Sequence, residues 1–223
     1  MASSGTTSFN ITIDEVIEEA YERCGVRTNS GNDIRSARRS LNLLFSEWGN
    51  RGINLWKVKS KTETLVNGQV TYNTPSDCND VLEAVVTVSG GTQQSLTKIS
   101  RSEYIAIPNK TATGTPSQYY VDRQITPTIS LYLAPDTSAV TNIFYYYLAR
   151  IEAAGAYTNT TDMPFRFFPC MVSGLAFYLS QKIAPDRVQA LKLLYEDELK
   201  RALEEDGQRT SVYISPNVYY PQG

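Results

Sequence analysis

The sequence predicts an α+β fold in which helices from both ends of the chain form one bundle and an antiparallel β-sandwich or barrel-like domain is inserted between them. Apolar residues recur at helical spacing over 1–52 and again over 151–206, whereas short alternating segments separated by turn residues occupy 53–150. Neither terminal pair of helices can bury its apolar stripe alone, so a shared bundle is the simplest arrangement. The remaining residues, 207–223, are expected to form an extended C-terminal tail.

Two helices are predicted in the N-terminal region. Thr12 and Glu15 have the spacing of a capping box, and Gly25 suits the position just after a helix end. A second helix is expected to begin near Asn32 and to end at Gly52. The apolar stripes of the two helices are Ile13, Val16, Ile17 and Ala20 in the first, and Ile34, Ala37, Leu41, Leu44, Phe45 and Trp48 in the second.

The central region reads as a series of short strands. The segment LWKVKSKTETLV alternates, and Asn67 with Gly68 predicts a hairpin to the following QVTYN. VLEAVVTV ends at a Gly-Gly pair, and SLTKIS is expected to pair back across that turn. Ser100 and Glu103 predict a single helical turn, after which QYYVDR, TISLYL and IFYYYLAR supply further strands.

The C-terminal hairpin follows a small polar linker. Asp162 is expected to cap it, with Pro164 in the first turn, where a missing N–H costs nothing. Pro169 lies too deep for that position, so we expect a short turn over 164–168 and a main helix from Pro169 to Ile183.

The last helix is expected to begin with Asp186 as its cap and to run to about Asp206. The tail that follows has no helical pattern but is rich in Tyr and Val. Ordering its backbone costs more than burial of its tyrosines returns, so we expect the tail to order only on a partner, as an added strand in many copies together.

The composition argues against several classes of function. Lys and Arg total 21 against 23 Asp and Glu, a net charge of −2, so the chain lacks the basic surplus of a protein that grips nucleic acid. The absence of histidine excludes Ser-His-Asp and Cys-His catalysis and histidine-ligated zinc. Cys24, Cys78 and Cys170 lie far apart, which favours reduced thiols over disulfides or a metal site. We expect no catalytic residue, cofactor or metal, and no signal peptide or membrane span.

Two clusters could carry chemistry. Asp77, Asp80 and Glu83 could supply the acid pair of a glycosidase, but a turn whose Asp side chains satisfy local backbone groups is favoured. Lys98, Arg101 and Lys110 beside Tyr104 could bind single-stranded nucleic acid, and here a solvated strand edge is the favoured interpretation.

Two long segments carry a likeness to a known family. ISRSEYIAIPNKTATGTPSQYYVDRQITPTISLYLAPD and PFRFFPCMVSGLAFYLSQKIAPDRVQALKLLYEDELKRALEEDGQRTSVYISP resemble the head-to-tail adaptor proteins of short-tailed bacteriophages, podoviruses, including the tail tubular protein A type and the head-completion type. The likeness covers nearly the whole chain, since the helix–β–helix order and the tail are shared. It contains no catalytic motif.

The resemblance implies a structural virion protein made in the host cytoplasm and located at the head-to-tail interface. Such adaptors assemble as a dodecameric homo-oligomer ring beneath the portal protein and extend the channel through which genomic DNA passes without sequence-specific binding. They present a surface to the tail nozzle or tail tube protein, and possible further partners are tail fibres. The C-terminal segment of some members reaches the portal.

The resemblance assigns roles to three groups of residues. The portal-docking tail would use Val212, Tyr213, Ile214, Tyr219 and Tyr220. The acidic helix over 186–206 would face the DNA through Glu196, Glu204 and Glu205. The hairpin has more aromatic side chains than one helical stripe can use internally, so some of them are expected in the seam between neighbouring subunits: Phe165, Phe167, Phe168, Phe177 and Tyr178.

Two alternatives to the structural adaptor stay open on the sequence. One is a carbohydrate- or peptidoglycan-active, tail-associated protein that uses the β domain and the acids near Asp77. The other is a DNA-binding module, against which the net charge of −2 argues.

Overall fold

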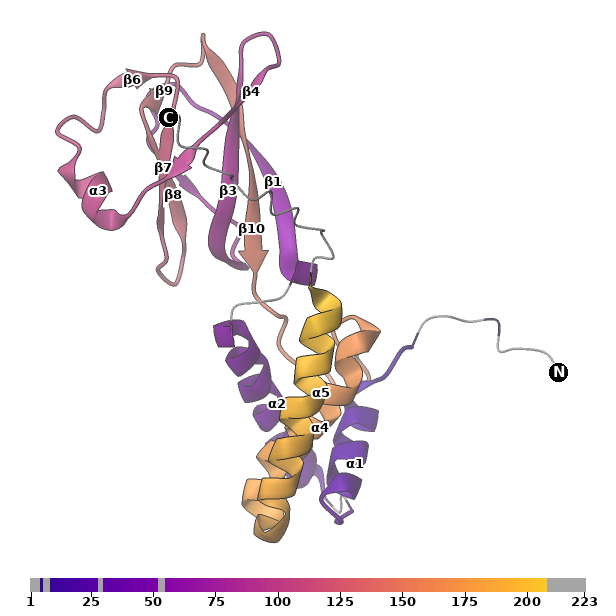
Figure 1. The fold of residues 1–223 in the computed structure, drawn as a ribbon. Helices are drawn as coiled ribbons and strands as arrows, with labels where there is room; N and C mark the ends of the chain where they lie inside the picture. The colour runs from indigo at the N-terminus through magenta and orange to yellow at the C-terminus, as the bar shows by residue number, and fades with distance from the viewer. Residues whose placement is uncertain (1–4, 6–8, 28–29, 52–54, 208–223) are drawn as a thin grey trace, which may run out of the picture.

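The computed structural model describes residues 5, 9–27, 30–51 and 55–207, and these form an α+β structure as predicted. Figure 1 shows two bodies: a helical body, built from helices near both ends of the chain, and a β module, built from the strands between them. Within the described residues, each helix is too short or too polar to cross a lipid bilayer.

The helical body follows the predicted apolar stripes. Its helices are α1 (Ile13–Arg23), α2 (Gly31–Arg51), α4 (Phe168–Ile183) and α5 (Val188–Asp206). The predicted capping box begins α1, where the amide of Thr12 donates to the Glu15 carboxylate at 2.7 Å. Gly25 follows the end of α1 with φ at +77°, a backbone conformation that favours glycine.

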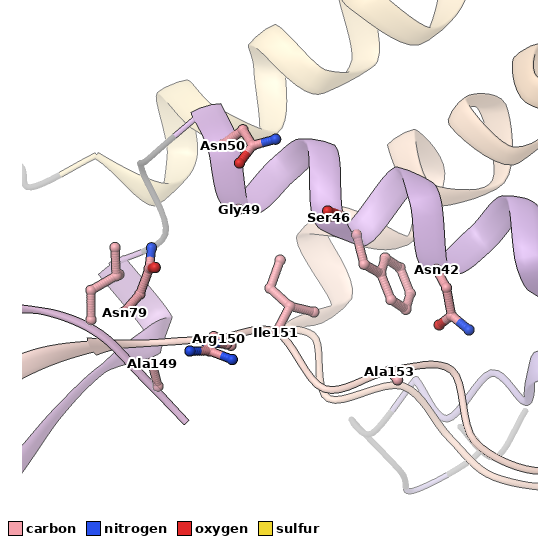
Figure 2. Close-up of a pocket in the computed structure, with 11 residues that line it drawn as sticks. Asn42, Ser46, Gly49, Asn50, Asn79, Ala149, Arg150, Ile151 and Ala153 are labelled. Carbon is pink, nitrogen blue, oxygen red and sulfur yellow. The ribbon is translucent and has the colours of Figure 1, made fainter. Parts of the chain in front are cut away.

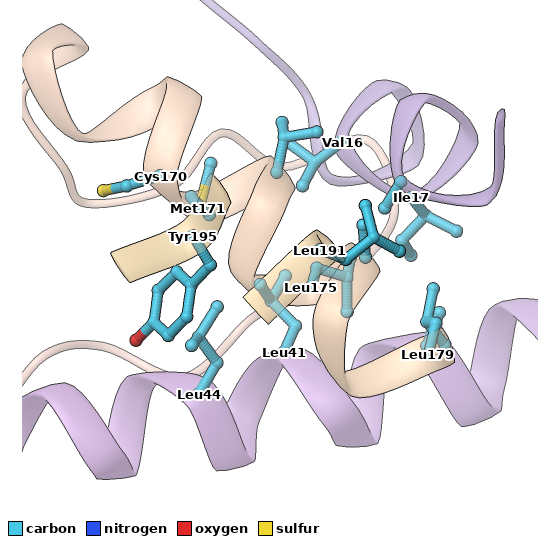
Figure 3. Close-up of a cluster of buried hydrophobic side chains, with 14 of the residues drawn as sticks. Val16, Ile17, Leu41, Leu44, Cys170, Met171, Leu175, Leu179, Leu191 and Tyr195 are labelled. Carbon is cyan, nitrogen blue, oxygen red and sulfur yellow. The ribbon is translucent and has the colours of Figure 1, made fainter. Parts of the chain in front are cut away.

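The core of the helical body brings both ends of the chain together. Helix α4 packs against α1, α2 and α5 and is buried on most sides. The side chains labelled in Figure 3 come from all four helices: Val16, Ile17, Leu41, Leu44, Cys170, Met171, Leu175, Leu179, Leu191 and Tyr195. A methyl carbon added at Gly174 would lie 2.9 Å from Leu44 Cδ2 and 2.9 Å from Tyr195 Cε2. Glycine therefore lets α4 approach its neighbours this closely.

Two expected helix caps are wrong. The 3-10 turn η2 (Phe165–Phe167) precedes α4, and it is capped by Pro164, not by Asp162. The 3-10 turn η3 (Pro185–Arg187) contains Asp186, so this carboxylate lies inside the turn and not in front of α5. In both places a proline starts a tight turn that leads directly into the helix, which moves the N-terminus away from the carboxylate.

The strands of the β module form two four-stranded sheets and a short pair among the described residues. The first sheet has the order β1 (Val58–Thr64), β10 (Val140–Ala149), β3 (Cys78–Val88) and β4 (Gln93–Ser95). The second has the order β2 (Thr71–Asn73), β8 (Thr128–Tyr132), β7 (Gln118–Asp122) and β5 (Thr97–Lys98). The short pair joins β6 (Thr113–Gly114) to β9 (Ala134–Pro135). Pairing is antiparallel except between β5 and β7 and between β6 and β9.

The two sheets enclose a second hydrophobic core, separate from the helical one, as in a β-sandwich. Tyr119, Ile129 and Leu131 of the second sheet meet Ile143 and Tyr145 of the first. The short helix α3 (Arg101–Ala106) connects β5 to β6 and begins with the predicted capping box.

The hairpin expected at Asn67 and Gly68 is wrong. The turn itself is present, with Gly68 at φ +74° and its amide donating to the Pro135 carbonyl at 2.9 Å. However, β1 pairs with β10 and β2 pairs with β8, so the chain crosses from one sheet to the other here. The SLTKIS segment likewise divides between the two sheets, because Ser95 pairs with β3 whereas β5 pairs with β7.

An ion pair between a buried lysine and a half-exposed aspartate joins the two bodies. The 3-10 turn η1 (Leu55–Lys57) leads into β1, and Lys57 is 1% exposed there. Its ammonium group forms an ion pair with Asp162 and lies 4.8 Å from the centroid of the Trp56 ring. The Trp56 ring in turn lies 5.9 Å from that of Phe167, which is buried in the helical core. The start of the β module is thus tied to the C-terminal hairpin.

Removing Asp162 and removing Lys57 are expected to lower the free energy of unfolding by different amounts. Asp162→Ala leaves a buried ammonium without its carboxylate and should lower the free energy of unfolding by about 2–3 kcal/mol. Lys57→Met fills the same space and leaves a half-exposed carboxylate that water can solvate, so its cost should stay within about 1 kcal/mol. Urea unfolding of both variants tests this asymmetry, and equal costs would contradict it.

Candidate functional site

Two of the three acids considered for catalysis, Asp77 and Asp80, are held by cations, and the third, Glu83, is exposed on β3. Lys59 Nζ lies 3.0 Å from the Asp77 carboxylate, and Lys98 Nζ lies 2.8 Å from that of Asp80. Partial burial acts to raise the pKa of Asp77, but the hydrogen bond from Lys59 helps to outweigh it, and the pKa lies below its ordinary value. A glycosidase acid needs a raised pKa, so this geometry favours the structural interpretation of the turn.

The aromatic ring considered for nucleic-acid stacking is already in contact with other side chains. The Tyr104 ring stacks on Tyr120 with centroids 5.1 Å apart, and Lys110 Nζ lies 5.6 Å from its centroid. Lys110 also donates to the Ile107 carbonyl at 2.9 Å, and Lys98 is paired with Asp80. These contacts favour a structural role for this strand edge.

The cysteines are buried free thiols in both bodies. Burial raises the pKa of Cys170 to about 12, which keeps it protonated and unreactive at neutral pH. Among the residues that the structure describes, no three Cys, Asp or Glu side chains are placed to hold a metal ion.

A pocket lies at the junction of the two bodies, between α2 and the end of β10 (Figure 2). Its volume is about 330 Å³, and its polar lining includes Asn42, Asn50, Asn79 and Arg150. Asn42 is already used, because its Oδ1 accepts a hydrogen bond of 2.7 Å from the Ala154 amide. Among the described residues that line the pocket, Arg150 is the only one with a formally charged side chain, and none carries a carboxyl group for acid–base catalysis.

The acids expected to face DNA lie on the outer side of α5. Glu196 is exposed and accepts hydrogen bonds of 3.0 and 3.1 Å from Arg51 of α2, which hold the pKa of Glu196 below its ordinary value. Glu204 is exposed and lies 4.0 Å from Lys200 on the next turn. Glu205 is also exposed. All three carboxylates are therefore accessible on one helix, although Glu196 is partly neutralised.

Beneath this surface a polar network fixes α5 against α2. Trp48 Nε1 donates to the Tyr195 hydroxyl at 2.8 Å, and that hydroxyl donates to Glu47 Oε2 at 2.9 Å. Arg51 forms an ion pair with Glu47 as well as with Glu196. Burial raises the pKa of Tyr195, so the phenol stays protonated and can donate.

Removing this hydroxyl is expected to destabilise the helical body. Tyr195→Phe leaves the buried Trp48 N–H without an acceptor and should lower the free energy of unfolding by about 1–3 kcal/mol. Tyr178→Phe is the matched control on α4, expected to change stability by no more than about 0.5 kcal/mol. Urea unfolding followed by tryptophan fluorescence measures both, and equal stability of the two variants would contradict the role of the network.

The aromatic residues expected in the subunit seam occupy three kinds of place. Phe165 is 61% exposed and its ring lies 5.6 Å from that of the exposed Phe9. Phe168, Phe177 and Tyr178 are half-buried against the helical core. Phe167 is 1% exposed, so its assignment to the seam is corrected: it is a core residue because η2 turns its ring inward onto Trp48.

The residues expected to dock on the portal, Val212, Tyr213, Ile214, Tyr219 and Tyr220, lie outside the described residues. The last described residue, Gly207, follows the end of α5. Asp206 at this end is 6% exposed and forms an ion pair with Arg166 of η2. The C-terminal end of α5 is therefore held against η2 by a charged contact.

Sequence reasoning missed two charged helix faces. The exposed side of α1 carries Glu15, Glu18, Glu19 and Glu22, and the exposed side of α2 carries Arg35 and Arg39. Both faces could have been found by marking the residues opposite each apolar stripe. The overall charge of −2 does not reveal them, because it sums acidic and basic faces over the whole chain.

Comparison with known proteins identifies the family. The model of the SU10 adaptor protein family matches residues 11–219, which include every helix and strand described above. No curated protein matches the chain. The match agrees with the resemblance to phage head-to-tail adaptors that the sequence segments carry. The chain belongs to the SU10 adaptor protein family, whose members are structural adaptors of bacteriophages.

Proposed function

We propose that this chain is a virion structural protein that forms a dodecameric ring joining the portal protein to the tail nozzle or tail tube. The family match over residues 11–219 is the observation that carries the proposal, because it covers both the helical body and the β module. The ring extends the channel for genomic DNA at the head-to-tail interface.

The two-body architecture suits a connector. The helical body closes on a core drawn from both ends of the chain, so the β module can project from it without disturbing that core (Figure 1). The separate sandwich core gives the β module its own stability for contacts with tail proteins or fibres. The helical body is then available for the contacts between neighbouring subunits of the ring.

The acidic face of α5 is assigned to the channel wall. The exposed side of α5 carries four acidic and three basic residues, a net charge of −1. A wall of this sign repels phosphates, so packaged DNA can slide past without sticking. Glu196, Glu204 and Glu205, together with Asp197, are the exposed acids that would set this sign.

A structural role, and not an enzymatic one, is also part of the proposal. The ion pairs of Asp77 and Asp80 with lysines support it, because they hold these carboxylates as structural partners of neighbouring strands. The alternative of a peptidoglycan-active protein would need two free carboxyl groups with different pKa values. Asp77 and Asp80 are instead both paired with lysines.

The proposal is tested by removing the chain from a phage that carries its gene. Purified particles should then be portal-bearing heads without tails, and supplying the chain in trans should restore tailed, infectious virions. Quantitative mass spectrometry of intact virions should give twelve copies for each portal ring. Tailed virions that lack this chain would overturn the proposal.

A further inference from the structure

Helix α2 presents a stripe that its own chain does not cover. Arg35, Arg39, Leu43 and Ser46 recur every three or four residues on the side opposite the buried stripe of α2. Leu43 is 60% exposed, whereas the other two leucines of α2, Leu41 and Leu44, are fully buried. The stripe therefore consists of an apolar side chain with basic side chains one and two turns before it.

A groove of complementary character runs between α1 and the start of α4. Its volume is about 480 Å³, and its apolar lining is Ile11, Phe168, Pro169 and Val172. Glu15 and Glu19 of α1 line its edge, together with Arg23, which lies 3.0 Å from Glu19. The groove can accept an apolar side chain and offers carboxylates to a neighbouring cation.

The stripe and the groove lie on different flanks of the helical body. Figure 1 shows α2 at one edge of this body and α1 at the other, and both helices pack on α4. Helix α1 carries five acidic residues and one basic residue, a net charge of −4, whereas α2 carries four basic and two acidic residues, a net charge of +2. Because residues opposite a buried stripe point away from the core, the stripe and the acidic face cannot satisfy each other within one copy.

We propose that the α2 stripe of one copy occupies the α1–α4 groove of the next copy, with Leu43 in the groove and Arg39 against Glu15 and Glu19. Arg39 and Leu43 lie four residues apart, about 6 Å along the helix, which matches the separation of Glu15 and Glu19. A contact between two different flanks of identical subunits is heterologous, and repetition of it closes a ring when the rotation allows. This inference rests on the ring proposed above and names the surfaces that build it.

Charge exchange between the two faces gives a specific test. Glu19→Arg with Glu22→Arg reverses the acidic face, and Arg35→Glu with Arg39→Glu reverses the stripe; Glu15 is left intact because it caps α1. Each double variant should load onto portal-bearing heads about tenfold less than the unmodified chain or worse, because like charges then oppose each other. An equal mixture of the two should recover loading, because each reversed face then meets its complement on a neighbour.

The apolar contact has its own test with a matched control. Leu43→Asp places a carboxylate against the acidic groove and should reduce loading as strongly as charge reversal. Leu193→Asp makes the same change at a leucine on α5 that is 64% exposed and outside the stripe, and it should load normally. Each free variant should unfold at about the temperature of the unmodified chain, and thermal unfolding checks that the fold is retained.

The possible outcomes distinguish failure of the proposed interface from failure of the proposed ring. If the unmodified chain does not form rings on portal-bearing heads, the proposed function is overturned and the interface with it. If it forms rings and both double variants do so equally well, the interface alone is overturned. Loss in each double variant without recovery in the mixture also contradicts the pairing of these two faces, whereas loss with recovery supports it.

Discussion

Gly174→Val is expected to melt the helical body at much lower temperature than the unmodified chain, with a loss of about 3 kcal/mol or more. The new Cβ alone would lie 2.9 Å from Leu44 Cδ2 and from Tyr195 Cε2, and two further methyl groups would follow it. Helix α4 cannot move away, because α1, α2 and α5 all pack on it. The clash must therefore separate the helices that join the two chain ends.

Tryptophan fluorescence during thermal unfolding measures the loss of stability in the helical body. The chain has two tryptophans, and the rings of Trp48 and Trp56 both lie within 6 Å of Phe167 in the helical core. Gly49→Ala is the matched control, since a Cβ there meets nothing within 4 Å and should add about 0.5–1 kcal/mol of helix stability. Similar melting of Gly174→Val and the unmodified chain would mean that α4 is not packed as described.

Deletion of residues 209–223 is expected to abolish loading onto the portal and to leave the helical body and β module intact. The deleted segment contains Tyr213, Tyr219 and Tyr220, and every helix and strand described here ends before it. Ordering such a segment costs more than its own side chains return, so it should dock only through added strand hydrogen bonds and through the avidity of many copies in a ring.

The deletion is measured as copies of the chain bound per portal-bearing head, alongside the unfolding temperature of the free protein. A variant with the same tail residues in scrambled order controls for length and composition and should fail to load as well. A truncated chain that loads normally would show that the portal contact lies elsewhere.

The helices were predictable because their signals are local. Apolar periodicity, the capping boxes at Thr12 and Ser100, and the glycine after α1 each act within a few residues. The shared bundle was predictable because neither terminal pair of helices can bury its apolar stripe alone. For α4 the helical spacing of Leu175, Ala176, Leu179 and Ile183 predicts a single apolar stripe, whereas the helix is buried on most sides because three helices pack on it.

The errors arose where distant segments decide the outcome. Asn67 and Gly68 form the turn that their side chains favour, but the choice between a hairpin and a crossing between sheets depends on β10 and β8, more than fifty residues away. Asp162 had the chemistry of a helix cap, yet the buried ammonium of Lys57 holds it instead. Phe167 was one of the aromatic residues expected in the subunit seam, but its partner Trp48 comes from the other end of the chain.

For the two charged surfaces as well, the sequence predicts the local pattern and the structure gives the relative position. The acidic face of α1 and the arginine stripe of α2 are each visible in sequence once the apolar stripe is known. Their placement on opposite edges of one body required the structure, because it depends on how α1 and α2 pack around α4 (Figure 1). This placement is the basis of the proposed contact between α2 of one copy and the α1–α4 groove of the next.

A cryo-electron microscopy reconstruction of the virion neck, without imposed symmetry on the adaptor, tests the central claim most directly. The account predicts a ring of twelve copies between portal and tail, with the helical bodies in contact through α1 and α2 of adjacent copies and α5 toward the DNA. A neck without this chain, or a ring whose neighbouring copies touch only through their β modules, would contradict it.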